Sequence, residues 1–158
     1  MNVPYPRIGS VLLAVLWFLP GSALAAEDLP VLLKENFSRG FAAWDATDAN
    51  AWRVVDLPGT SNRVLELYRQ SDYKPPHRSP VNIALLKYNT VGDFVLTAKV
   101  RTTKESYGHR DMCLFFGYQD PSHFYYVHLG QETDDHANQI FIVNDTPRTK
   151  ISEKTSPG

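Results

Sequence analysis

The sequence predicts an all-β protein built as an antiparallel β-sandwich. Short segments rich in β-branched and aromatic residues follow one another, and clusters of Gly, Pro, Asn, Asp and Ser separate them. Apolar and polar residues alternate with a period of two in several of these segments, which is the pattern of a half-buried strand. No stretch of useful length after residue 25 shows the helical period. A series of short strands with turn signals between them is typical of a sandwich.

Residues 1–25 have the features of a secretory signal peptide. Arg7 is their only charged residue, the apolar run VLLAVLWFL is too short to span a bilayer, and Ala23-Leu24-Ala25 is a small-residue cleavage site. The alternative is a short membrane anchor. We therefore expect a secreted or periplasmic protein with no membrane span after cleavage, a linker over 26–32 and the sandwich domain over 33–158.

The first half of the domain contains four expected elements. VLLKENF (31–37) is expected to be the first strand, and FAAWDATDANAWRVVD (41–56) places two tryptophans around a polar loop. RVLELYR (63–69) alternates clearly. Three prolines make the start of SDYKPPHRSPVNIALL (71–86) irregular, because proline cannot donate to a sheet ladder, and VNIALL (81–86) then predicts a short strand.

The second half has the strongest strand signals. DFVLTAKVRT (93–102) alternates throughout and is the clearest predicted strand. DMCLFFGY (111–118) and HFYYVHL (123–129) are joined by QDPS, which suits a four-residue hairpin loop. QIFIVN (139–144) follows, and DTPRT is expected to turn the chain into KIS.

The end of the sequence predicts an incomplete sandwich. We count about seven or eight strands, and the chain ends on SPG, which is itself a turn signal. A last strand at this point would leave a sheet edge open. We therefore hypothesise that the chain is the front part of a longer domain.

The predicted hairpin separates two faces of the sheet. Its register pairs Tyr118 with His123, Phe116 with Tyr125, Leu114 with Val127 and Met112 with Leu129. This face is apolar, so we expect it to be the core. The opposite face carries a mixture of rings and polar groups: Asp111, Cys113, Phe115, Gly117, Phe124, Tyr126, His128, Phe141 and Val143.

The mixed face suits a saccharide, because a pyranose ring offers C–H groups to an aromatic ring and hydroxyls to polar side chains. The alternative, in which other strands cover this face and His128 is inert, stays open. The expected catalytic pair is His128 and Asp111. The expected binding residues lie on this face or in loops, where binding groups usually collect: Tyr126, Phe115, His109, Arg110, Arg78, Asn82 and Asn138.

Composition and missing motifs exclude several functions. The net charge is −1 without a basic cluster, which argues against nucleic acid and anionic membranes and favours a neutral, polar partner. Cys113 is the only cysteine, so no intrachain disulfide forms, and it is most simply a small buried residue. GxSxG and HExxH are absent. No two acidic residues have the spacing on one strand that conventional glycoside hydrolysis would use.

Metal binding is expected mainly in the acidic loop ETDDHAN (132–138), and DATDAN (45–50) is a second candidate. A zinc site from His128, His136 and an aspartate matches no standard ligand spacing. Calcium fits better, because Asp134, Asp135 and loop carbonyls supply the oxygen ligands that it prefers. Calcium is therefore the one cofactor that the sequence suggests, and the alternative is a loop that simply faces solvent.

Several motifs together resemble the concanavalin A-like lectin/glucanase superfamily. They are NF…W, WRV, LEL, DFVLTAKVR and LFFGYQDPSHFYYVHL. The most similar branches look like the laminin-G-like jelly rolls and the 3-keto-disaccharide hydrolase (family-16-glycoside-hydrolase-like) domains of secreted bacterial proteins. The resemblance covers roughly residues 33–158, or the first two-thirds of such a domain, and the closing strands with a W-H-x-V-x-V-type motif are absent.

The resemblance implies a two-sheet jelly roll whose concave sheet binds saccharide, sometimes with a calcium ion at a loop. The matching positions are Asp111, Tyr126 and His128. The E-x-D-x-x-E strand of standard retaining glucanases is absent, which argues against that activity. In the 3-keto-disaccharide branch the implied chemistry is different, since one base is enough to begin elimination beside a ketone.

Three functions follow as expectations. The leading one is a secreted carbohydrate-binding jelly-roll domain, as part of a glycan-degrading protein. The second is a hydrolase or lyase acting on glycosidic bonds, with His128 as base and Asp111 as its orienter. The third is a structural or protein-interaction module of the laminin-G type. Whether the protein is an enzyme stays open.

Overall fold

The computed structural model describes residues 29–87, 90–108, 111–155 and 157. The expected signal peptide and the first part of the linker lie outside these residues. The chain divides into two compact units, Met1–Leu32 and Leu33–Gly158. Within the described residues, no helix is long and apolar enough to cross a membrane.

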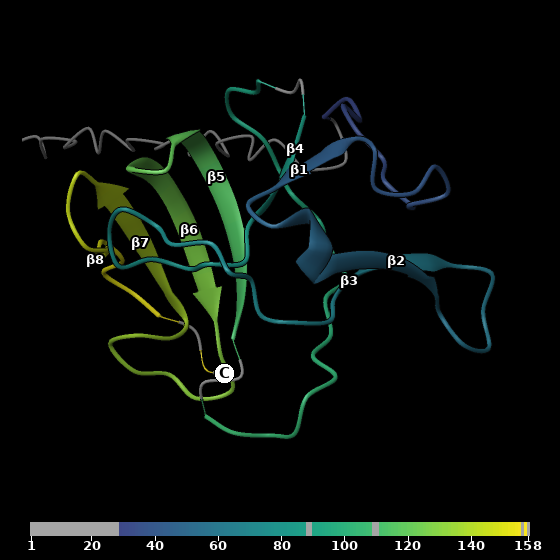
Figure 1. Cartoon of the computed structure of the whole chain (residues 1–158). Coiled ribbons are helices and arrows are strands. Elements are labelled where there is room, and N and C mark those ends of the chain that lie inside the picture. Colours follow the sequence, from purple (N-terminus) through teal and green to yellow (C-terminus); the bar gives the residue numbers. More distant parts are fainter. Residues whose placement is uncertain (1–28, 88–89, 109–110, 156, 158) are drawn as a thin grey trace, which may run out of the picture. The chain divides into compact units, whose positions relative to one another are not determined.

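The described part of the second unit is all-β, as the sequence predicts (Figure 1). Its only helical element is one 3₁₀ turn, η2 (Ala49–Ala51). The strands form three antiparallel sheets, ordered β1-β4, β2-β3 and β5-β6-β7-β8. The strands are β1 (Trp44–Ala46), β2 (Trp52–Asp56), β3 (Arg63–Leu67), β4 (Ala84–Leu86), β5 (Met112–Asp120), β6 (His123–Leu129), β7 (Gln139–Asn144) and β8 (Thr149–Lys150).

The register of the β5–β6 hairpin is as predicted except near its turn. The pairs Met112–Leu129, Leu114–Val127 and Phe116–Tyr125 are confirmed. The predicted pair of Tyr118 with His123 is wrong, because the register shifts after Phe116 and Asp120 pairs with His123 instead. Gly117 lies at this irregularity with φ +56°, a left-handed conformation in which glycine carries little strain.

The expected assignment of the core to one face of this sheet is wrong. The buried side chains are Phe124, Tyr126, Phe141 and Val143, and the partly buried Cys113, Phe115 and Tyr118 pack against them. Apart from Tyr118, which the register shift after Phe116 moves from the predicted apolar face, these residues belong to the mixed face. The opposite face, with Leu114, Phe116, Tyr125 and Val127, is only half-buried. The alternation along the strands was therefore predicted correctly, but the buried side was not.

The physical reason is the proline-rich segment between β3 and β4, which passes across the mixed face (Figure 1). The backbone N–H of Arg148, in the turn before β8, donates to the carbonyl of Arg78 in this segment at 3.1 Å. Further along the same segment, buried Ile83 lines one hollow together with Tyr118 of β5. The segment thus removes the aromatic rings from water, and this burial stabilises the fold.

Two predicted strands do not form. Residues 31–37 and 93–102 contain no strand, and Phe94, Leu96 and Val100 of the second segment are each about half exposed. A strand requires a hydrogen-bonded neighbour as well as an alternating pattern. No strand of the described part pairs with 93–102, so its strong pattern alone does not produce a ladder.

Candidate functional site

The central contact of the site joins His128, at the end of β6, to Asp111, immediately before β5. Nε2 of His128 lies 3.1 Å from Oδ2 of Asp111. The His128 side chain is 5% exposed, whereas that of Asp111 is 35% exposed. The strand pairing explains this contact, because His128 lies opposite Cys113 and Asp111 precedes Cys113 by two residues on the same face.

The other ring nitrogen of His128 contacts the backbone of the following loop. Nδ1 donates to the carbonyl oxygen of His136. A carbonyl oxygen only accepts hydrogen bonds, so Nδ1 must carry a proton. Both ring nitrogens therefore face oxygen atoms, and His128 has no free nitrogen directed at solvent. The carboxylate of Asp111 is the more accessible member of the pair.

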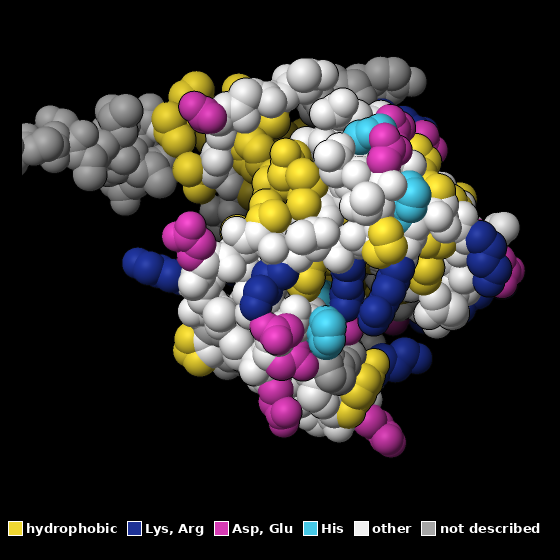
Figure 2. Space-filling view, turned by 90° about the vertical axis from the view of Figure 1, so that its left-hand side faces the viewer, with side chains coloured by type: hydrophobic (Ala, Val, Ile, Leu, Met, Phe, Trp, Pro, Cys, Tyr) yellow, Lys and Arg dark blue, Asp and Glu magenta, His cyan; other side chains and the backbone are white. Residues whose placement is uncertain are grey.

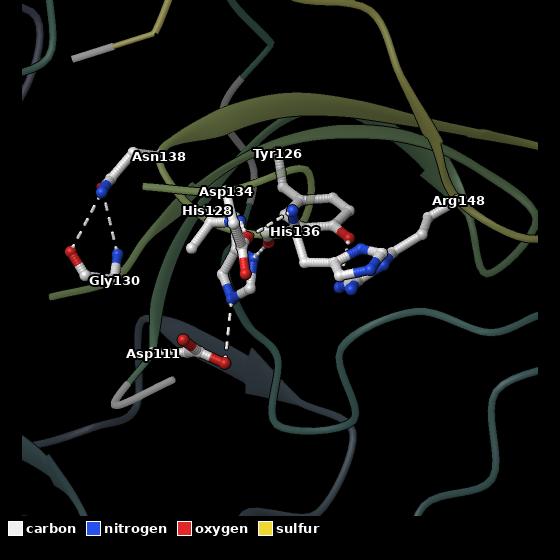
Figure 3. A network of polar contacts seen from close by, with 9 residues as sticks. Asp111, Tyr126, His128, Gly130, Asp134, His136, Asn138 and Arg148 are labelled. Atoms are coloured by element: carbon white, nitrogen blue, oxygen red, sulfur yellow. Dashed lines mark hydrogen bonds and ion pairs between the residues drawn. The ribbon is translucent and has the colours of Figure 1, made fainter. Parts of the chain in front are cut away.

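Side-chain hydrogen bonds fix the loop between β6 and β7. Asn138, with φ +56°, donates from Nδ2 to the carbonyl of Gly130 at 3.2 Å and accepts at Oδ1 from the Gly130 N–H at 3.1 Å (Figure 3). Oδ1 of Asp134 accepts from the N–H groups of His136 at 2.6 Å and Ala137 at 2.8 Å. This short-range network holds the His136 carbonyl against His128.

Arg148 is held in place from the side of the core. Its Nη1 donates to the hydroxyl of Tyr126 at 3.3 Å, and its guanidinium carbon lies 4.9 Å from the centre of the Phe141 ring. Both rings are at most 2% exposed. Burial raises the pKa of the Tyr126 hydroxyl, and Arg148 opposes this shift. The hydroxyl therefore stays protonated and available as an acceptor for Arg148.

These groups surround a hollow of about 320 Å³. It is lined by Arg78, Asp111, His128, His136 and Arg148. The lining comes from the proline-rich segment, the start of β5, the end of β6, the β6–β7 loop and the β7–β8 turn. Viewed from the side of β7 and β8, basic side chains gather beside histidine and acidic side chains (Figure 2). Hydrogen-bond donors and acceptors therefore line the same hollow.

Some of the sequence-predicted residues meet in this hollow and others do not. Asp111, His128 and Arg78 line it. Asn138 only shapes the neighbouring loop, and Oδ1 of Asn82 accepts from the Ser71 N–H at 2.8 Å instead of reaching the hollow. His109 and Arg110 lie outside the described residues.

The expected aromatic platform for a sugar is not accessible. Tyr126 is fully buried and stacks against Phe115 and Phe141 at centroid distances of 5.6 and 5.3 Å. Phe115 itself packs against the core. The prediction that Tyr126 contacts a ligand directly is therefore corrected, because its ring is fully buried, whereas Phe115 is only partly buried against the core and its contact with a ligand stays a prediction. Tyr126 instead orients Arg148.

The expected calcium ligands are used within the protein. Oδ1 of Asp134 binds two backbone N–H groups, and Asp135 forms an ion pair with Lys150, which lowers the pKa of Asp135. In the part of the chain that the structure describes, no three His, Cys, Asp or Glu side chains gather as a metal site. Both carboxylates thus have partners within the protein, and a calcium site at Asp134 and Asp135 stays a prediction.

Sequence reasoning missed Arg148 and did not assign His136 to ligand binding. The signal for His136 was its place in the polar loop after His128. Arg148 gave little signal, since its position depends on the β7–β8 turn and on the distant Arg78 backbone. The expectation that Cys113 is a structural residue agrees with its chemistry, because burial raises the pKa of its thiol to about 12.

No family model, no curated protein and no solved structure matches this chain.

Proposed function

We propose that the protein is a secreted carbohydrate-binding domain of the jelly-roll type and that the hollow beside His128 is its saccharide site. The observation that carries the proposal is the convergence of five polar side chains from five separate segments around one hollow of about 320 Å³. This volume falls within the range of small-ligand sites, which is about 300–1,000 Å³.

The chemistry of the lining suits hydroxyl groups. A sugar hydroxyl both donates and accepts hydrogen bonds, so it is best recognised where donors and acceptors stand side by side. Arg78 and Arg148 provide donors, while Asp111 provides an acceptor that is partly open to solvent. Because the aromatic rings are covered, recognition depends on these hydrogen bonds and not on ring stacking.

A glycan array followed by calorimetry tests this proposal. The secreted chain should bind at least one oligosaccharide, and Asp111→Ala should weaken binding by about tenfold or more, as expected for a lost charge-assisted hydrogen bond. Asp56→Ala is the matched control, since Asp56 also forms an ion pair, with Arg63 at 3.4 Å, but belongs to the β2–β3 sheet. Absence of binding to every glycan would leave the protein-interaction module as the better proposal.

A second candidate, cleavage of a glycosidic bond, is favoured by the contact between Asp111 and His128. The expected roles are then reversed: the accessible Asp111 is the base, and His128 is the group that orients it. In a 3-keto-glycoside, the base removes the proton from the carbon beside the ketone. The C–H electron pair forms a C=C bond, and the glycosidic oxygen leaves with its bonding electrons and is then protonated.

Turnover of a 3-keto-glycoside decides this second candidate. Asp111→Asn retains the shape of the side chain but removes its basicity, so it should abolish turnover and leave folding intact. Product formed at an unchanged rate by Asp111→Asn would contradict the assignment of Asp111 as base. The Asp56→Asn control should retain the activity of the unmodified chain.

A further inference from the structure

We infer that the ligand of the hollow is an acidic saccharide, whose carboxylate or sulfate ester binds between Arg78 and Arg148. This inference rests on the proposed saccharide function and specifies its substrate class. It replaces the neutral partner that the overall charge of the sequence suggested.

The two arginines bring positive charge that the surrounding protein does not neutralise. Among the described residues, Arg53, Arg63 and Arg69 each form an ion pair with a carboxylate. In that same part of the chain, no ion pair joins a carboxylate to Arg78 or Arg148. Asp111, the one carboxylate that lines the hollow, is engaged with His128. An anionic ligand group would provide the missing partner.

Arg148 is fixed before any ligand arrives. The Tyr126 hydroxyl uses one of its five N–H donors, and the buried Phe141 ring supports the guanidinium plane. A preorganised guanidinium loses little conformational entropy on binding a carboxylate or a sulfate. The backbone bond from Arg148 to the carbonyl of Arg78 also keeps the two chain segments together. The Arg148 side chain is therefore fixed, and the backbone of Arg78 is held beside it, while the Arg78 side chain is exposed.

Asp111, at the other end of the hollow from Arg148, favours a sugar over a simple inorganic anion as the ligand. In Figure 3, Asp111 and Arg148 lie on either side of His128. The carboxylate of Asp111 repels an anion but accepts hydrogen bonds from hydroxyls. A ligand that satisfies both ends carries its negative charge near the arginines and its hydroxyl groups near Asp111. An acidic sugar unit has this distribution of groups.

The overall charge of the chain does not itself attract anions, so any preference for an acidic ligand must come from the positive charge of Arg78 and Arg148. The net charge is −1, so general attraction of anions to the whole protein is not expected. Selective binding of acidic glycans would therefore come from the two arginines at the hollow. Such binding should weaken as salt is added, because the contact is partly exposed to solvent.

Calorimetry with matched oligosaccharides tests the inference. The first pair of probes is tetragalacturonic acid and its fully methyl-esterified form, which share one skeleton and differ in charge. The second pair is a sulfated galactan tetrasaccharide with and without its sulfate esters. The acidic member of at least one pair should bind about tenfold or more tightly than its neutral counterpart, and the pair that shows the difference identifies the acidic group.

Two variants assign the effect to the arginines. Arg78→Ala removes an exposed side chain, and Arg148→Met removes the charge while an apolar chain still covers Phe141. Each should lower the affinity for the acidic probe by about tenfold and the affinity for the neutral probe by clearly less, so that the preference for the acidic probe is lost. Arg53→Met is the matched control, because the Arg53 guanidinium carbon also lies over a ring, 4.6 Å from the centre of Tyr68, on another sheet.

The outcomes separate this inference from the proposed function. Equal binding of neutral and acidic probes at the hollow would overturn the inference and leave the saccharide function standing. Loss of all oligosaccharide binding would overturn both. Binding of sodium sulfate as tight as that of the sulfated tetrasaccharide would show an anion site without sugar recognition, which would also overturn the inference.

Discussion

Two adjacent tyrosines on β6 provide a direct test of which face of the four-stranded sheet is the core. Tyr126 is fully buried, whereas Tyr125 is half-buried on the other face and stacks on Phe116 at 5.6 Å. Replacement of a fully buried aromatic residue by alanine costs about 3–5 kcal/mol, because it removes apolar contacts and leaves a cavity. A half-buried ring loses only part of that, about 1–2 kcal/mol. Tyr126→Ala should therefore be clearly more destabilising than Tyr125→Ala.

Urea unfolding followed by tryptophan fluorescence measures the difference. A domain of this size has a total stability of about 5–15 kcal/mol, and its urea dependence is about 1–3 kcal/mol per molar. Tyr126→Ala should thus lower the urea midpoint by about 2 M, and Tyr125→Ala by less than about 1 M. An equal or larger loss in Tyr125→Ala would show that the Tyr125 face is the core and would refute the burial described here.

Three further measurements test other parts of the structure. The pKa of His123 is raised by its hydrogen bond to Asp120, so this contact should stabilise the fold fully below about pH 6.5, and the stabilisation should be lost as pH rises through the folded-state pKa. The pKa of Asp120 is lowered, mainly by the Ser122 N–H, so its contribution should be lost as pH falls into the acid range. Urea midpoints of His123→Gln and the unmodified chain should therefore converge at alkaline pH. Cys113, with its pKa raised to about 12, should react with a thiol reagent at pH 8 far more slowly in the folded protein than in urea, and equal labelling rates would contradict the raised pKa. Backbone amides of β6 should exchange with deuterium far more slowly than those of 93–102, and equal rates would mean that 93–102 is paired in solution.

Local patterns predicted the strands whose neighbours are close in sequence. HFYYVHL and QIFIVN match β6 and β7 residue for residue, because alternation and flanking turn residues agree at both ends. Segment 93–102 has an equally clear pattern but no strand. Pattern describes which side chains share a face, whereas a ladder also needs a partner whose position depends on the rest of the chain.

The buried side of the sheet could not be predicted for a similar reason. Composition favoured the wrong face, because Phe116 and Tyr125 have mainly apolar neighbours on their face, whereas Phe124 and Tyr126 share theirs with the polar His128. The proline-rich segment (68–83) determines which face is buried, because it crosses only one of them. Its contacts, such as the bond between the Arg148 N–H and the Arg78 carbonyl, are distant in sequence and leave no local pattern.

The contact between Asp111 and His128 was within reach of sequence reasoning, because it follows from the hairpin register. The sequence did not indicate which member of the pair is accessible to a ligand. The hydrogen bond from His128 to the His136 carbonyl depends on the conformation of the β6–β7 loop, which Asn138 fixes with φ +56°. Only with that bond does Asp111 become the accessible group.

The core and the hollow lie on the same face of the four-stranded sheet. The period of two along β6 aligns Phe124, Tyr126 and His128, so the row of buried rings ends in an imidazole. A buried imidazole needs hydrogen-bond partners, so polar groups beside it could serve stability alone. Arg78 separates the two roles, because it is exposed and lines the hollow without contacting the ring of His128 by any hydrogen bond that the structure shows. If Arg78→Ala leaves the urea midpoint unchanged and weakens binding of an acidic saccharide, the hollow recognises a ligand. If it changes neither, the polar groups serve only to satisfy His128.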